Sequence, residues 1–335
     1  MNPREIVQPL LRLGESVRDA VRAALAERSP EERVQIHGKA ASDVIYRIDL
    51  DAENAILGFL REHAERLGGI VLVAEGMGEG SVNAYPKDMD PAKAAWRIMM
   101  DPIDGTRGLM VGKRGAFFVA GAAPHHPGPG RLSDIEAAVM VEIPTDRSHL
   151  SDVLWAVKGA GTQGYTRDLS TRSSRPLVPA PSGEKTIHGG FGQISRFFHP
   201  GKDVLAIMED ELIRELYPET KSGEIVTFED QYVCSAGQMY ELIMGRDRFT
   251  ADLRHSLYAK FGREGRITGH ECHPYDLSAH LVALEAGILL EDGRGSPLDA
   301  PMDTSTNLDW AGFANRSIRD QVSPVLARLV KKHLG

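Results

Sequence analysis

The chain opens with long amphipathic segments separated by short apolar or Gly-rich stretches. Residues 4–28 place apolar side chains at three- and four-residue steps, which predicts a helix with one buried face. Those apolar positions are Ile6, Leu10, Leu11, Leu13, Val17, Val21 and Leu25. A Ser-Pro pair at 29–30 ends this helix. A second helix is predicted over 51–67 and stops at the Gly-Gly pair 68–69, with residues 44–48 as a short bridge before it, either a strand or the helix entry.

Short apolar runs follow, and each predicts a buried strand. They cover residues 70–74, 96–100, 116–122, 137–143 and 153–157. The next stretch, 159–186, is dense in Gly, Ser, Thr, Arg and Pro, which is typical of a crossing between two parts of a chain. The first half is therefore predicted to be rich in strands.

The second half mixes the two periodicities. Its predicted strands are 186–190 and 288–290, and its predicted helices are 204–216, 237–244, 277–285 and 317–333. Because no strict βαβ repeat emerges, we expect a layered α/β (or α+β) fold with two sheets. We expect an amino-terminal subdomain over 1–165 and a carboxy-terminal subdomain over 166–335.

Length, charge and cysteine content exclude several classes of protein. A chain of 335 residues suits about two domains and buries a core without disulfide or metal staples. The formal net charge is −8, from 47 acidic and 39 basic residues, so we expect no nucleic-acid partner. Cys234 and Cys272 form no CxxC pair, which favours a reducing, cytoplasmic setting. We expect no signal peptide and, since no apolar run reaches about 18 residues, no membrane span.

The segment with the clearest chemistry follows the apolar run 96–100. Asp101 and Asp104 are two carboxylates at the end of a predicted strand, with Pro102 to force a turn. Hard divalent cations such as Mg²⁺ bind carboxylate oxygens. Gly105 lets the backbone approach a ligand closely, and backbone amides that open a helix suit a phosphate. Thr106 adds a hydroxyl. The alternative is an acidic turn with no ligand.

Three further acidic segments fit the same kind of site. Glu75 directly follows the apolar run 70–74, although an ordinary loop acid would look the same. Asp276 opens a predicted apolar helix, and Asp43 and Asp49 precede another. Capping of these helices is the alternative role for the three aspartates.

Taken together and in order, these segments resemble the inositol monophosphatase/fructose-1,6-bisphosphatase superfamily of metal-dependent, lithium-sensitive phosphatases. The loop from Asp101 to Thr106 resembles its signature loop, and the segment from Asp276 to Gly287 resembles its carboxy-terminal signature. Lys39, Asp43 and Asp49 are similar to its early Lys-Asp-Asp pattern, and the resemblance spans about residues 10–330. It implies a layered αβαβα sandwich.

The resemblance implies a binding site for two or three Mg²⁺ ions. Glu75, Asp101 and the Ile103 carbonyl would hold one ion, and Glu75 also counts as catalytic. Asp101, Asp104 and Asp276 would hold a second. The implied activity is that of a phosphomonoesterase, which hydrolyses a small polyol or sugar phosphate by in-line attack of a metal-activated water.

The resemblance also implies roles around the substrate. Thr106, with Asp49 behind it, would orient the attacking water. The amides of Gly105 and Thr106 would cradle the phosphate, and Ser235 and Ala236 would contact the substrate. The expected partners are a small phosphorylated substrate and a second copy of the chain in a homodimer.

Some positions depart from the family pattern. Tyr275 replaces the usual Trp before the last aspartate, and residues 254–273 look like an insertion that leaves no match for the family's substrate-contacting acid. The run His270 to His273 lacks the spacing of a helical zinc motif, so we expect a structural or substrate-loop role. Two alternatives remain. One is a haloacid-dehalogenase-type phosphatase with an aspartyl nucleophile, and the other is a catalytically silent metal- or phosphate-binding protein.

Overall fold

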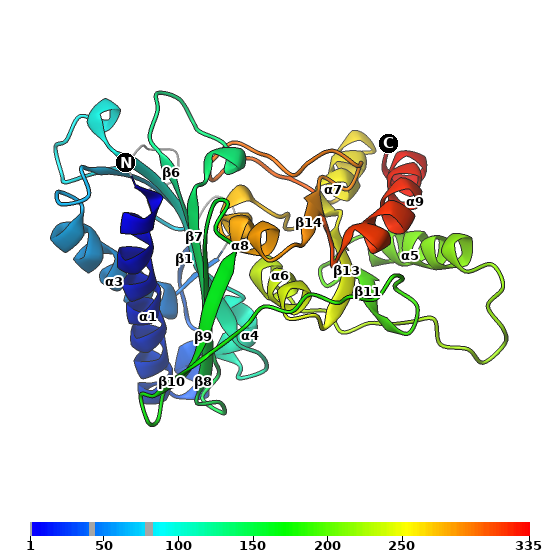
Figure 1. Ribbon diagram of the computed structural model, residues 1–335, viewed down its shortest axis with the longest axis horizontal. Helices are drawn as coiled ribbons and strands as arrows, with labels where there is room; N and C mark the ends of the chain where they lie inside the picture. Colours follow the sequence, from blue (N-terminus) through cyan, green and yellow to red (C-terminus); the bar gives the residue numbers. More distant parts are fainter. Residues whose placement is uncertain (1, 40–43, 78–82) are drawn as a thin grey trace.

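The computed structural model describes residues 2–39, 44–77 and 83–335. In Figure 1 the elements stack side by side as alternating layers of helices and sheets. The helices are α1 (Pro3–Glu27), α2 (Pro30–Arg33), α3 (Arg47–His63), α4 (Thr106–Met110), α5 (Lys202–Leu216), α6 (Ser235–Ile243), α7 (Arg254–Arg263), α8 (His280–Glu285) and α9 (Arg316–Leu334). Short 3₁₀ turns are η1 (Pro91–Lys93), η2 (Leu132–Asp134) and η3 (Pro274–Leu277).

The strands form two main sheets and one small hairpin. The eight-stranded sheet has the order β10-β9-β8-β7-β6-β5-β3-β4, and the five-stranded sheet has the order β12-β11-β13-β15-β14. The strands of the first are β3 (Ile70–Ala74), β4 (Asn83–Tyr85), β5 (Trp96–Asp104), β6 (Ala116–Pro124), β7 (Ala137–Ile143), β8 (Leu150–Val157), β9 (Thr162–Asp168) and β10 (Ser174–Pro176). Those of the second are β11 (Gly190–Ile194), β12 (Thr227–Phe228), β13 (Asp247–Asp252), β14 (Leu289–Glu291) and β15 (Trp310–Phe313). The hairpin pairs β1 (Ile36–Lys39) with β2 (Val44–Tyr46).

Three separate apolar cores hold these layers together. The first lies between the helices α1 and α3 and the large sheet. The second lies between the two sheets, where α6 and α8 contact strands of both. The third lies between the small sheet and the outer helices α5, α7 and α9. This order of layers confirms the expected layered α/β fold with two sheets (Figure 1).

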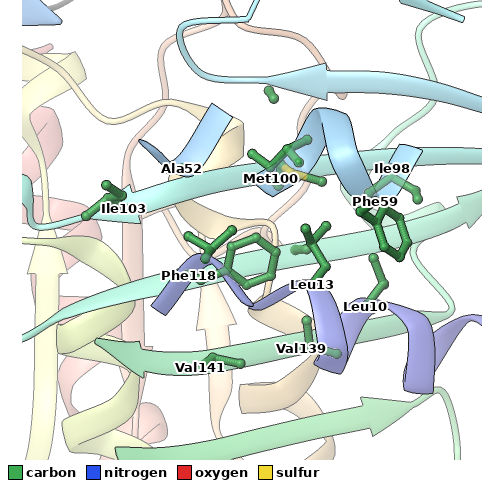
Figure 2. Close-up of a cluster of buried hydrophobic side chains, with 14 of the residues drawn as sticks. Leu10, Leu13, Ala52, Phe59, Ile98, Met100, Ile103, Phe118, Val139 and Val141 are labelled. Atoms are coloured by element: carbon green, nitrogen blue, oxygen red, sulfur yellow. The ribbon is translucent and has the colours of Figure 1, made fainter. Parts of the chain in front are cut away.

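The first core explains why residue spacing predicted α1 correctly. Leu13 of α1 lies next to Phe118 of β6, and Leu10 of α1 lies next to Phe59 of α3 (Figure 2). Both leucines are buried, and each such side chain contributes about 1.5–3 kcal/mol when it is removed from water. Gly14 lets the helix approach the sheet, because a Cβ there would lie 2.7 Å from Phe118 Cδ1.

Most of the predicted elements are confirmed, with small shifts at their ends. The predicted strands 70–74 and 137–143 match β3 and β7, and the final helix matches α9 to within one residue at each end. The second helix begins at Arg47 instead of residue 51, because the Asp49 carboxylate accepts a hydrogen bond from Tyr46 N and so caps the helix earlier.

Three predictions for the second half were wrong in detail. The stretch 159–186 is not only a crossing, because β9 and β10 extend the large sheet there. The strand predicted at 186–190 lies instead at β11, and the helix predicted over 277–285 is divided into η3 and α8. The sheet order does not by itself define folding units, so the division near residue 165 stays a prediction. Within the described residues, no helix combines the length and the hydropathy needed to cross a membrane.

Candidate metal and phosphate site

The candidate site lies where two adjacent strands of the large sheet end. β3 and β5 are parallel neighbours, with Ala74 opposite Met100. The next residues, Glu75 and Asp101, therefore emerge at the same edge of the sheet, and Glu75 N donates a hydrogen bond to Met100 O at 3.4 Å. The strand register thus brings together two acids that are distant in sequence.

A bulge in β5 turns the second carboxylate toward the same space. Opposite β6, Asp101 pairs with Val119 and Asp104 pairs with Phe117, so β5 carries one extra residue between these pairs. Asp101 Oδ1 accepts a hydrogen bond from Ile103 N at 2.8 Å, which fixes the turn. The bulge therefore replaces the alternation of an ordinary strand, which would place residues 101 and 104 on opposite faces.

The loop after β5 depends on a glycine. Gly105 has a φ of 103°, in the left-handed region where a side chain is strained. A Cβ at this position would also lie 3.2 Å from Cys234 Sγ. Thr106 follows at the start of α4, and its Oγ1 donates to the Ile103 carbonyl at 2.7 Å. That carbonyl oxygen keeps a second lone pair for a cation.

The carboxy-terminal half contributes the third aspartate and part of the support. Asp104 Oδ2 accepts from Ala236 N at 2.6 Å at the first turn of α6, where backbone amides lack helical acceptors. Asp276 lies in η3, and its Oδ2 accepts from His273 N at 2.7 Å. Carboxylate oxygens of Asp101, Asp104 and Asp276 lie within 4.8 Å of one another.

When ionised, these buried acids give the pocket a strongly negative electrostatic potential. Burial raises the pKa of Asp101 well above its ordinary value, and the charges of the other acids raise it further. Burial and the nearby Asp276 likewise raise the pKa of Asp104, and burial raises the pKa of Asp276. Three carboxylates at this separation need compensating positive charge or protons.

A divalent cation fits this donor set. All the side-chain donors in the cluster are carboxylate oxygens, and the Ile103 carbonyl adds a further oxygen. Oxygen-only donor sets are what Mg²⁺ and Ca²⁺ bind, whereas zinc sites usually include nitrogen or sulfur. Cys234 lies nearby, but burial raises the pKa of its thiol far above the ordinary value, so it is a poor metal ligand.

The structure brings nearly all the predicted site residues to one cavity. Its walls include Asp49, Glu75, Asp101, Ile103, Asp104, Gly105, Thr106, Ser235 and Asp276. Ala236 is not among the residues that line this cavity, although its amide donates to Asp104, which does line it. The Lys39 side chain and Asp43 lie outside the described residues.

Other residues of the cavity were not anticipated from the sequence. Phe197 and Phe198 follow β11, and Arg254 begins α7 just beyond β13. Their segments carry no recognisable motif, so only the fold reveals that they meet. His270 also lines the cavity, and its expected substrate-loop or structural role stays a prediction. Both ends of the segment 254–273 therefore reach the site.

Comparison with known proteins identifies the fold. No family model and no curated protein matches this sequence. Among solved structures, the IMPase of Thermotoga maritima matches with a TM-score of 0.62 and 15% identity, over 99% of this chain and 100% of that chain. Fructose-1,6-bisphosphatase of Leishmania major matches with a TM-score of 0.66 and 12% identity, over 97% and 93%. Extragenic suppressor protein suhB of Bartonella henselae gives a TM-score of 0.63 and 16% identity, over 96% and 98%. The chain therefore has the same fold as these three solved structures.

Proposed function

We propose that this chain is a Mg²⁺-dependent phosphomonoesterase that hydrolyses a small polyol or sugar phosphate. The observation that carries the proposal is the cluster of Asp101, Asp104 and Asp276 within 4.8 Å, set in a cavity of this fold. The names of the similar solved structures, among them an IMPase and a fructose-1,6-bisphosphatase, support the same class of substrate.

The proposed metal ligands divide into two sets. Glu75, Asp101 and the Ile103 carbonyl would hold one Mg²⁺, and Asp101, Asp104 and Asp276 would hold a second. When bound, these ions supply the positive charge that makes water a better nucleophile and stabilises the leaving oxygen. The acidic lining of the cavity would also suit a third Mg²⁺ ion.

The chain's own groups would position the reactants. Thr106 Oγ1 donates a hydrogen bond to Ile103 O, so its lone pairs would accept a hydrogen bond from a water and fix the orientation of that water. Asp49, which lines the same cavity and accepts a hydrogen bond from Tyr46 N, would support Thr106 from behind. The amides of Gly105 and Thr106 would bind phosphate oxygens. Ser235 and Ala236 would contact the substrate, and the Ala236 amide would then be shared between the substrate and Asp104.

We also propose a homodimer in the cytoplasm. The dimer rests on the family resemblance alone. Both cysteines are free and buried, which suits a reducing compartment.

A phosphate-release panel tests the proposed function. Wild type and Asp104→Asn are assayed with Mg²⁺, with and without Li⁺, on inositol, sugar and nucleotide phosphates, with Asp309→Asn as a buried aspartate outside the cavity. We expect release by wild type and Asp309→Asn, inhibition by Li⁺, and loss of most activity in Asp104→Asn. Unchanged turnover in Asp104→Asn would refute the assignment.

Two further outcomes of the panel separate the alternatives. A phosphorylated Asp101 or Asp104 trapped by acid during turnover would indicate an aspartyl nucleophile and contradict direct attack by water. A folded wild type that binds Mg²⁺ but releases phosphate from no substrate would indicate a silent binding protein.

A further inference from the structure

The end of β13 carries an acid that is fully engaged by its own neighbour. Asp252 is 0% exposed, and both of its carboxylate oxygens accept from Arg254. Arg254 Nε lies 2.9 Å from each oxygen, and Nη2 lies 2.6 Å from Oδ2. Asp252 is the last residue of the strand that precedes the segment 254–273.

The Arg254 guanidinium is held rigidly on its other sides. Its Nη1 donates to the His270 carbonyl at 3.2 Å. Phe197 and Phe198 lie with ring centroids 5.0 and 5.2 Å from Cζ, within the range of cation–π attraction. Arg254 is only 4% exposed, and it is among the residues that line the cavity. An arginine held in this way loses little conformational entropy when it binds a ligand.

Arg254 can offer only hydrogen-bond donors to the cavity that it lines, because a guanidinium has no acceptor. The hydrogen bonds above engage one N–H on each of its three nitrogens, so each terminal nitrogen keeps one further N–H. Asp104 and Asp276 lie within electrostatic range of Arg254, which places it beside the proposed metal cluster. A group bound here must offer acceptor oxygens, and a planar fork of N–H groups suits a carboxylate or phosphate best.

We propose that Arg254 selects substrates whose leaving group carries a second anionic group, either a carboxylate or a phosphate. This rests on the proposed function, because the first phosphate is taken to lie on the metal cluster. Phe197 and Phe198 fix the plane of the guanidinium and pack against the carbon skeleton of the substrate. The preferred substrates are thus phosphorylated sugar acids or sugar bisphosphates, and uncharged polyol monophosphates are poorer.

Two matched pairs of probes test the selectivity. Glycerol 3-phosphate and 3-phosphoglycerate differ by a carboxylate, and fructose 1-phosphate and fructose 1,6-bisphosphate differ by a phosphate. A hydrogen-bonded ion pair predicts a kcat/KM at least about tenfold higher for the anionic member of at least one pair. The pair that shows the preference identifies the source of the charge. Equal kcat/KM within both pairs would overturn the proposal.

Variants assign the preference to Arg254. Arg254→Lys keeps the charge but lacks the fork, and should lose most of the preference. Because an unpaired Asp252 can unfold the protein, the double variant Asp252→Leu with Arg254→Met replaces the whole buried pair by apolar groups. In this double variant the KM for the anionic probe should rise until the preference is lost. The variant should still hydrolyse the uncharged member of each pair. Arg266→Met, at another arginine packed on an aromatic ring, is the control and should keep the preference.

The two proposals fail in different ways. A wild type that releases phosphate from none of the probes, with p-nitrophenyl phosphate included, contradicts the proposed function itself. A wild type that prefers the anionic probes, with the same preference in the folded double variant, contradicts only the role of Arg254.

Discussion

Removal of one charge from the acidic cluster should have opposite effects on stability and activity. In the metal-free protein, Asp101, Asp104 and Asp276 repel one another across no more than 4.8 Å. At that separation two unit charges repel by about 3.5 kcal/mol at an effective dielectric constant near 20. A carboxylate can avoid this by keeping its proton, which at pH 7 costs about 4 kcal/mol for an ordinary pKa near 3.9. The charge on Asp104 therefore destabilises the metal-free fold by at most about 4 kcal/mol.

Asp104→Asn retains the volume of the side chain and an oxygen that accepts from Ala236 N. The exchange of a charged for a neutral acceptor weakens that hydrogen bond by about 1 kcal/mol. We therefore expect the metal-free variant to be about 1–3 kcal/mol more stable than wild type at pH 7. Wild type should also gain about 2.7 kcal/mol from Mg²⁺ at a hundred times the dissociation constant, whereas the variant gains much less.

Urea denaturation in EDTA and in Mg²⁺ measures both effects, alongside the rate of phosphate release. Asp309→Asn is the control, because Asp309 is buried and hydrogen-bonded to Ser256 away from the cavity. It should keep the gain from Mg²⁺. A metal-free Asp104→Asn less stable than wild type, or an equal gain from Mg²⁺ in both, would refute the electrostatic reasoning.

Three other substitutions probe separate features. Gly105→Ala forces a side chain into a left-handed backbone and should cost about 1–2 kcal/mol in thermal unfolding, whereas Gly58→Ala, in open space on α3, should be neutral or stabilising. Burial lowers the pKa of His280 to about 4, so as the pH falls from about 6.5 toward 4 the unfolded state takes up its proton first. The fold then loses up to about 3 kcal/mol, and His280→Gln should flatten this part of the stability–pH curve. Glu285 accepts hydrogen bonds from two backbone amides of the turn between β8 and β9. Glu285→Gln should therefore lower the free energy of unfolding by about 1 kcal/mol and leave kcat per folded molecule unchanged. A loss of kcat would give Glu285 a role in the site.

Local features of the sequence determined the metal-binding half of this picture. The spacing of apolar residues in 4–28 predicts α1 because a helix that packs on a sheet must bury one face. The loop from Asp101 to Thr106 could be interpreted from the sequence because its strand, turn, glycine and acids lie within a few residues. Glu75 and Asp276 were assigned to the same site because they occur in the order of the family motifs, and in the structure both residues line the cavity.

Only the tertiary structure brought the aromatic side chains and Arg254 to the cavity. Phe197 follows β11 and Arg254 follows β13, and the two meet because these strands are parallel neighbours in the small sheet. The His270 carbonyl joins them by accepting a hydrogen bond from Arg254. β9 and β10 were missed because their residues are largely polar, so they belong to the sheet through pairing with β8 and not through an apolar pattern. Periodicity records which residues one element buries, but pairing between strands distant in the chain depends on the whole fold. The sequence alone therefore predicted where a metal would bind, and the fold was needed to show that Arg254 lines the same cavity.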